Sequence, residues 1–276
     1  MEKDWDTIDG LYQRALAEKA SGRNDDAAAL LKRVLALDPE DHLGAALVLA
    51  QANRKGAGLD TDTRVQPTKA PDAYVASLFD QIADRFDAIL VDELGYAVPL
   101  MLADLLVETI GGEFERWLDL GCGTGLCAMA LEEQTKHRVG VDLASKMLDM
   151  ASDLDLYHEL FHAEAVQFLA TQPLQQPFDL VTAADVLPYI GDLDPLLEGL
   201  AKCTTAGSIF GFSTERLEIN EPVYALGEQK RFAHSTDYLA RMLDQHGWLT
   251  LTSKAIIVRT ENGIPVPGDL VIARHQ

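Results

Sequence analysis

The chain has 276 residues, 47% of them hydrophobic and 24% charged, which is typical of a globular protein with one large domain and room for a small appendage. Its formal net charge of −21 argues against a nucleic-acid partner, because affinity for a polyanion comes largely from lysine and arginine. The three cysteines, Cys122, Cys127 and Cys203, have the spacing of neither a metal site nor a disulfide framework. No signal-peptide pattern and no apolar stretch of about 18 residues occur, so we expect a cytoplasmic protein without a membrane span.

Residues 8–56 have apolar positions at a period of about 3.6, which predicts helices. Gly22 marks a turn between two of them, and Pro39 ends the second. The layout resembles a tetratricopeptide (TPR) repeat, with a partial second repeat from His42 to Gly56. Because a stable array needs at least about three repeats, we interpret the segment as a helical cap on the next domain. The alternative is a surface for a protein partner or a homodimer.

Residues 57–71 are polar and interrupted by proline, so we predict a linker. A helical segment that contains Tyr74 and Phe79 follows it. Phe79 and Phe86 are one heptad apart, which favours packing of this face against the next predicted helix, 97–110.

From Phe114 onward, short apolar strands alternate with helical segments, which is the pattern of a doubly wound, Rossmann-like parallel sheet. The predicted strands are 114–120, 138–142, 159–162, one starting at Phe178, 207–214, 248–258 and 269–273. The predicted helices are 126–134, 144–151, 165–170, one starting at Asp194, and 236–245. The expected fold is therefore α/β, with a seven-stranded domain over residues 72–276, a linker and a small all-α extension over residues 1–56.

Gly121, Gly123 and Gly125 stand at alternate positions between the first strand and a helix. Glycine tolerates positive φ and lets the backbone approach a ligand, and the first N–H groups of a helix favour a carboxylate or phosphate. The dinucleotide fingerprint Gly-x-Gly-x-x-Gly needs its third glycine one residue later, where this chain has Leu126. This spacing disfavours an NAD-dependent oxidoreductase, and an ordinary glycine-rich turn is the remaining alternative.

Asp142 ends the second predicted strand, 17 residues after Gly125. A carboxylate at this position can accept hydrogen bonds from both ribose hydroxyls of an adenosine. A helix N-cap is the alternative role for Asp142, because a helix is predicted to follow at once.

With Asp119 directly before the first glycine, the string 117–126 resembles motif I of the class I S-adenosylmethionine (SAM) methyltransferases. The resemblance implies that SAM is the cofactor, that no metal is needed, and that the loop wraps the methionine part of SAM. It also implies contacts with the adenine and the methyl group and an aromatic lid over the cofactor. The residues at these positions are Asp119, Met147, Ala163 and Glu164 for the cofactor, Ala184 beside the methyl, and Tyr74 and Phe79 for the lid.

The stretch 178–190 resembles motif IV of the same family, which brings Asp185 to the open edge of the sheet. The Asn/Asp-Pro-Pro-Tyr/Phe tetrapeptide of base-methylating enzymes is absent, since Val-Leu-Pro-Tyr follows Asp185. Asp185 and Tyr189, together with Tyr238 and His234, are the candidates for a base or an orienting group. His234 is predicted to lie over the carboxyl edge of the sheet, between strand five and the next helix. The alternative is an ordinary hydrogen-bonded histidine.

The chain as a whole is similar to bacterial SAM-dependent methyltransferases with an N-terminal TPR segment. The similarity extends through 78–87, 185–193, 231–238 and 259–268. It implies methyl transfer to a small-molecule acceptor that the motifs do not specify. The alternative is a SAM-binding scaffold or regulatory protein that recruits a partner through the TPR-like helices.

Overall fold

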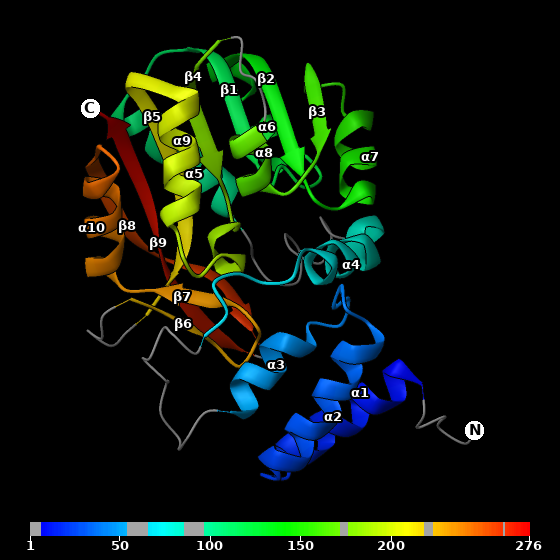
Figure 1. The fold of residues 1–276 in the computed structure, drawn as a ribbon. Helices are drawn as coiled ribbons and strands as arrows, with labels where there is room; N and C mark the ends of the chain where they lie inside the picture. Colours follow the sequence, from blue (N-terminus) through cyan, green and yellow to red (C-terminus); the bar gives the residue numbers. More distant parts are fainter. Residues whose placement is uncertain (1–6, 54–65, 86–96, 172–175, 218–222, 262) are drawn as a thin grey trace.

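A computed structural model describes residues 7–53, 66–85, 97–171, 176–217, 223–261 and 263–276 (Figure 1). Phe86, which was expected to pack beside Phe79, lies outside these ranges, as do residues 57–65 of the predicted linker. Within the described ranges, every helix falls short of the length and apolarity needed to cross a membrane.

The described residues form one mixed sheet of nine strands. Five parallel strands in the order β3-β2-β1-β4-β5 continue into antiparallel β9 and then β8, which gives the seven strands predicted from the sequence. A short hairpin, β6–β7, was not predicted and extends the end of β5. The strands are β1 Phe114–Leu120, β2 Thr135–Asp142, β3 Glu159–His162, β4 Phe178–Ala183, β5 Thr204–Arg216, β6 Tyr224–Leu226, β7 Phe232–His234, β8 Trp248–Glu261 and β9 Ile264–His275.

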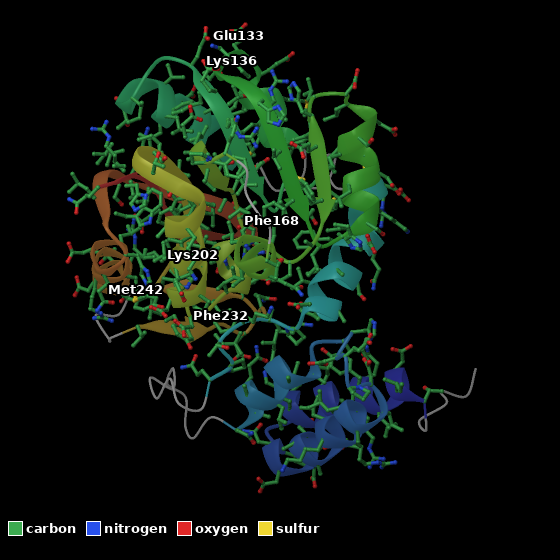
Figure 2. All side chains as sticks on the ribbon, turned by 45° about the horizontal axis from the view of Figure 1, so that its top comes forward. Glu133, Lys136, Phe168, Lys202, Phe232 and Met242 are labelled. Carbon is green, nitrogen blue, oxygen red and sulfur yellow. The ribbon has the colours of Figure 1, made fainter. Side chains whose placement is uncertain are left out.

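Helices cover both faces of the sheet, as the doubly wound pattern predicts (Figure 1). Trp117 of β1 packs in the apolar cluster with α5 and α6, whereas its neighbour Leu118 packs in the cluster with α8, α9 and α10. Successive strand residues point to opposite faces, so a strand covered on both sides is apolar at nearly every position. The helices are α5 Val98–Thr109, α6 Leu126–Ala130, α7 Ser145–Asp153, α8 Ala165–Thr171, α9 Asp194–Cys203 and α10 Thr236–Gln245. At the end of the domain farthest from α1–α3, Glu133 and Lys136 point into solvent (Figure 2).

The N-terminal helices are α1 Ile8–Ala20, α2 Asn24–Leu37 and α3 Ala45–Ala52. They share a small apolar core of their own, and Gly22 makes the predicted turn with a φ of 76°. The helical hairpin is therefore present where the sequence predicted it.

The turn of the β6–β7 hairpin connects these helices to the sheet (Figure 1). Gln51 Nε2 donates to the Gly227 carbonyl oxygen at 2.7 Å, and Lys19 Nζ lies 2.7 Å from a carboxylate oxygen of Glu228. The Lys230 ammonium donates to Tyr12 Oη of α1 at 3.3 Å. The helices thus contact the sheet domain through this turn, and Leu47 of α3 also packs in the large apolar cluster of that domain.

The part of the predicted linker that the structure describes is not a free connection. The Ala70 N–H donates to the Tyr189 carbonyl oxygen at 2.8 Å, and the Gly191 N–H donates to the Thr68 carbonyl oxygen at 2.8 Å. Polar composition indicated a loop correctly, but these backbone hydrogen bonds fix residues 66–71 against the sheet domain. Helix α4, Asp72–Ile82, follows directly.

Candidate functional site

A cavity lies at the carboxyl ends of the parallel strands and contains roughly 990 Å³ of space, including the part open to solvent. Helix α4, the glycine loop after β1 and the ends of β2 and β4 all contribute to its wall. Ligands of open α/β sheets bind at this edge. Of the predicted site residues, the following line it: Phe79, Gly121, Gly123, Asp142, Met147, Ala163, Glu164, Ala184, Asp185 and Tyr189.

The glycine loop has the left-handed backbone that its sequence predicts. The φ angles of Gly121, Gly123 and Gly125 are 64°, 54° and 97°. A Cβ atom on Gly121 would also stand 2.4 Å from a methyl carbon of Val186. Gly125 does not line the cavity; it is the N-cap residue of α6, which ends at Ala130 and is shorter than predicted. Two glycines thus form cavity wall, and the third directs the chain into the helix.

Ala144 is the N-cap of α7, so the alternative role of a helix N-cap for Asp142 is wrong. Asp142 is instead fixed by backbone N–H groups of the glycine loop and of the turn before α7. Its carboxylate accepts from the Gly123 N–H at 2.9 Å and from the Ala144 N–H at 2.8 Å, directly before α7. Burial raises the pKa of Asp142, and these backbone N–H groups oppose that rise. Each carboxylate oxygen can accept more than one hydrogen bond, and Asp142 lines the cavity. The carboxylate therefore holds the glycine loop and can still accept from a ligand.

The predicted contact of Asp119 with the cofactor is not made directly. Asp119 is 1% exposed and lies below the glycine loop on the same strand face as Trp117. Its carboxylate accepts from Tyr157 Oη at 2.7 Å and from Thr182 Oγ1 at 2.6 Å. Burial raises its pKa to about 7, against the lowering effect of these hydroxyls. Asp119 supports the loop from within the core.

We expect this carboxyl group to make stability depend on pH. A folded-state pKa of about 7, above the ordinary 3.8, stabilises the folded protein below about pH 4, and this contribution is lost as pH rises through 7. Relative to Asp119→Asn, the wild-type free energy of unfolding should therefore fall by up to about 4 kcal/mol between pH 4 and pH 8. Urea unfolding of both proteins across this range measures the difference. If the difference in free energy of unfolding between the two proteins does not change with pH, the raised pKa of Asp119 is wrong.

Phe79, Met147 and Glu164 bound one end of the cavity. Met147 is buried in α7, and the Phe79 ring meets the Tyr189 ring edge to face with centroids 5.5 Å apart. Glu164 accepts from the Gln167 N–H at 2.8 Å and so caps the start of α8, and Lys69 Nζ lies 3.6 Å from it. Glu164 thus has a structural role at the start of α8, and it also lines the cavity.

Tyr74 is not part of a lid over the cavity, contrary to the prediction. Val75 and Phe79 are one helical turn apart and line the cavity, whereas Tyr74 points toward the N-terminal helices. There its ring packs against Gly44, where an added Cβ would stand 2.9 Å from a ring carbon. The rotation of α4 about its axis places Phe79 at the cavity and Tyr74 at the contact with α3.

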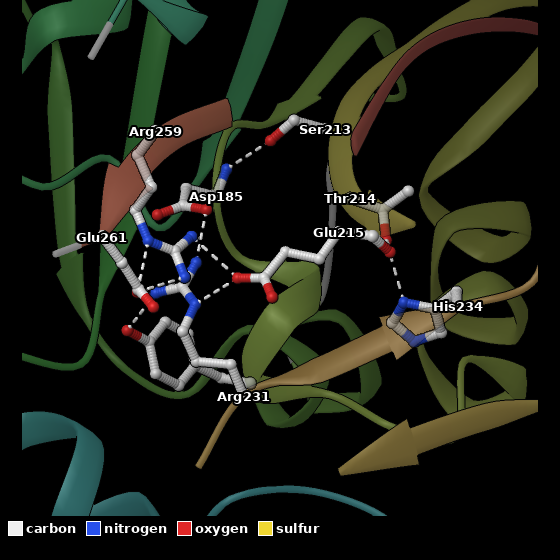
Figure 3. Close-up of polar contacts among 9 residues, drawn as sticks. Asp185, Ser213, Thr214, Glu215, Arg231, His234, Arg259 and Glu261 are labelled. Atoms are coloured by element: carbon white, nitrogen blue, oxygen red, sulfur yellow. Dashed lines mark hydrogen bonds and ion pairs between the residues drawn. The ribbon is translucent and has the colours of Figure 1, made fainter. Parts of the chain in front are cut away.

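Asp185 lies just past β4 in a left-handed conformation, with a φ of 60°, and its N–H donates to Ser213 Oγ at 2.8 Å. One carboxylate oxygen accepts from Arg231 Nη2 at 2.6 Å. Arg231 Nη1 donates to Tyr189 Oη at 2.7 Å, and its Nε donates to Glu215 at 2.5 Å. One guanidinium thus holds both candidate catalytic side chains. Figure 3 shows Arg231 beside Asp185 and Glu215.

Glu215 also pairs with a second arginine. Arg259 Nη1 lies 2.7 Å from the Glu215 carboxylate but outside hydrogen-bond geometry, so this contact is an ion pair only. Arg259 Nε donates to Glu261 at 2.7 Å. We call Asp185, Glu215, Arg231, Arg259 and Glu261 the ion-pair cluster. Sequence reasoning missed its arginines, because nothing in the local pattern around Arg231 or Arg259 indicates that they meet.

The prediction that His234 lies over the opening is wrong. His234 lies in β7, is fully buried and does not line the cavity. Its Nδ1 lies 2.8 Å from Thr214 Oγ1 and its Nε2 2.9 Å from the Ile190 carbonyl oxygen, so both ring nitrogens are satisfied. Burial lowers its pKa to about 4, and Figure 3 shows it directed toward Thr214 and away from Arg231. Tyr238 is buried as well, and its hydroxyl accepts from the Leu193 N–H at 2.9 Å.

Comparison with known families and curated proteins gives a match over the centre of this fold. Residues 118–210, from β1 into β5, match a family model described as a methyltransferase domain. A ubiquinone biosynthesis O-methyltransferase from Idiomarina loihiensis is 32% identical over 122 residues, which cover 42% of this chain and 49% of that protein. A similar protein from Aromatoleum aromaticum is 31% identical over 121 residues. The chain spans about half the length of the curated relatives it matches.

Solved structures share the wider fold at low identity. Magnesium protoporphyrin IX methyltransferase from Synechocystis PCC 6803, solved with bound SAM, aligns with a TM-score of 0.55 at 15% identity, covering 80% of this chain and all of that one. The chain therefore shares the fold of that methyltransferase, and residues 118–210 resemble a methyltransferase domain.

Proposed function

We propose that the protein transfers a methyl group from SAM to a small-molecule acceptor. The observation that carries this proposal is the arrangement of the cavity. The glycine loop and Asp142 form one side, and Asp185 and Tyr189 form another side of the same space. A cofactor with an adenosine and a methionine part fits this space in size and polarity, because pockets for such ligands measure about 300–1,000 Å³.

The residues present fit SAM by their own chemistry. Gly121 and Gly123 give bare backbone beside the loop, and Asp142 has acceptor capacity for ribose hydroxyls. Met147, Ala163 and Phe79 give an apolar slot for an adenine, with Glu164 at its edge. When bound, SAM supplies an activated methyl group on its sulfonium centre, and the pair of electrons of the broken C–S bond stays on sulfur.

The protein's own part is positioning and proton transfer. We propose that Asp185 accepts a hydrogen bond from the acceptor nucleophile and takes its proton as the methyl group is transferred. Burial raises the pKa of Asp185 against the lowering effect of Arg231, so its carboxylate is a stronger base than an exposed one. Tyr189 lies beside Asp185, because the Arg231 guanidinium donates to both side chains. Holding two reactants in line can supply much of the acceleration of such a displacement.

Separate calorimetric titrations with SAM, S-adenosylhomocysteine and NAD test the cofactor assignment. We expect binding of the first two at micromolar concentrations and none of NAD. Transfer of label from methyl-labelled SAM to small molecules then tests catalysis. Binding of SAM without transfer to any small molecule would favour the scaffold alternative.

We also propose that α1–α3 are a TPR-like unit that caps the domain over residues 72–276. The contacts of Gln51 and Lys19 with the β6–β7 turn, and of Lys230 with Tyr12, support this arrangement. The same helices leave their other faces available to a protein partner or a second copy.

The cap can be tested at Gln51, which is 6% exposed and donates to two carbonyl oxygens, those of Gly227 and Glu228. Gln51→Ala should cost about 1–3 kcal/mol, because it leaves partly buried carbonyl groups without a partner. Gln13→Ala, on the exposed side of α1, is the matched control and should change stability by less than about 0.5 kcal/mol. Thermal unfolding measures both, and equal effects would contradict the cap.

A further inference from the structure

An arginine beside a ligand cavity commonly indicates an anionic ligand, but Arg231 is already committed. Its Nε, Nη1 and Nη2 atoms donate to Glu215, Tyr189 and Asp185, respectively. Its side chain is only 11% exposed. An incoming carboxylate or phosphate would therefore have to displace a protein partner of the guanidinium.

Asp185 and Tyr189 offer the cavity different groups. The first oxygen of Asp185 is bonded to Arg231, and the second has no hydrogen-bond partner among the residues that the structure describes. The Asp185 side chain is 18% exposed, so this second oxygen is open to a donor from the cavity. Tyr189 accepts from Arg231 and keeps its own proton to donate.

The charges on the cavity wall are mostly negative. Its described lining contains four carboxylates, Asp72, Asp142, Glu164 and Asp185, and one cation, Lys69. Lys69 Nζ already lies 2.7 Å from Asp72 and 3.6 Å from Glu164. Behind the wall, the two other carboxylates of the ion-pair cluster, Glu215 and Glu261, face its two arginines, so they add no net charge. A bound cofactor with one net positive charge does not neutralise this excess of carboxylates, so the site stays negatively charged.

The remaining lining is apolar and suits a ring or chain without charge. Around Asp185 and Tyr189 it includes Val75, Phe79, Val186 and Ile190. An aromatic ring can be held there by edge or face contacts with Phe79 and Tyr189, which already pair with each other at 5.5 Å.

We infer that the acceptor is an apolar small molecule without negative charge whose nucleophile, a hydroxyl or an amine, donates a hydrogen bond to Asp185. Acceptors that carry a carboxylate or phosphate near the nucleophile are rejected by the excess of carboxylates. This inference rests on the proposed function and goes beyond it, because it names the charge class of the substrate. Arg231 is a positioning residue for Asp185 and Tyr189 and does not bind a substrate anion.

Two matched pairs of probes test this inference on the full chain. Catechol and 3,4-dihydroxybenzoate differ only by a carboxylate, and so do 1,2-diaminobenzene and 3,4-diaminobenzoate. Each is titrated by calorimetry into protein saturated with S-adenosylhomocysteine. We expect the uncharged member of at least one pair to bind at least about tenfold more tightly than its carboxylated partner. The pair that binds identifies the nucleophile as a hydroxyl or an amine.

The Asp185→Asn variant tests whether the charge of Asp185 causes the preference for the uncharged probe. It removes one negative charge beside Arg231, so the preference for the uncharged probe should shrink to less than about threefold. Asp104→Asn, an exposed change of the same charge on α5, should leave the preference as in the wild type. Unchanged affinity of Asp185→Asn for S-adenosylhomocysteine establishes that the variant folds with an intact cofactor side.

The outcomes separate the inference from the proposed function. Failure of S-adenosylhomocysteine to bind the wild type would reject the proposed function itself. If it binds, equal or tighter binding of the carboxylated probes overturns the inference. The inference is also overturned if none of the four probes binds at millimolar concentration. It is overturned as well if Asp185→Asn keeps the wild-type preference for the uncharged probe.

Discussion

Asp142→Ala should weaken SAM binding by at least about a hundredfold. Hydrogen bonds to a charged group contribute about 1.5–3 kcal/mol each, and two to the ribose give a factor of at least about 100. The variant also loses the acceptors for the Gly123 and Ala144 N–H groups, which adds disorder of the glycine loop to the loss. Calorimetric titration with SAM and S-adenosylhomocysteine measures the effect.

Two further variants separate these contributions. Asp149→Ala changes an exposed aspartate of the same helix, α7, and should leave affinity unchanged. Asp142→Asn keeps one carbonyl acceptor and should fall between wild type and Asp142→Ala. An affinity of Asp142→Ala within about twofold of wild type would reject the ribose assignment.

Arg231→Met should destabilise the folded protein by about 3–5 kcal/mol. Removal of one partner from a buried ion pair leaves uncompensated buried charge. Here both Asp185 and Glu215 lose a hydrogen bond, and Glu215 keeps only its contact with Arg259. The pKa of Asp185, which Arg231 lowers, should rise further. Urea unfolding at neutral pH measures the change in free energy.

The matched control is Lys202→Met on α9, where Lys202 lies 2.7 Å from Glu198 in an exposed pair of similar length (Figure 2). Exposed pairs contribute about 0–1 kcal/mol, so this variant should be nearly neutral. The double variant Arg231→Met/Glu215→Gln should recover part of the stability, because it removes one of the stranded charges. Equal effects of Arg231→Met and Lys202→Met would show that the ion-pair cluster does not act as a buried unit.

The cofactor side of the cavity could be predicted because its parts are close in sequence. β1, the glycine loop, α6 and β2 form one continuous strand–helix–strand unit between Phe114 and Asp142. Parallel pairing of Leu120 with Val141 then brings Asp142 next to Gly123. Spacing along the chain therefore sufficed to place these residues.

The acceptor side could not be predicted in the same way. Asp185, Glu215, Arg231 and Arg259 come from four separate segments, and a short contact between β5 and β7 sets the position of Arg231. Nothing in the spacing of these residues indicates that their side chains meet. The hairpin β6–β7 was missed because its strands have only three residues each, too few for a clear alternation.

Apart from the β6–β7 hairpin, the sequence by itself determined the order of strands and helices along the chain, the conformation of the glycine loop and the carboxylate at the end of β2. These follow from local backbone preferences and from hydrophobic periodicity, which act over a few residues. Only the tertiary structure decided that Phe79 and not Tyr74 faces the cavity, that His234 is buried beside Thr214, and that Arg231 is committed to Asp185. Those outcomes depend on the phase of α4 against α3 and on the pairing of β7 with β5, which are fixed by contacts between distant segments.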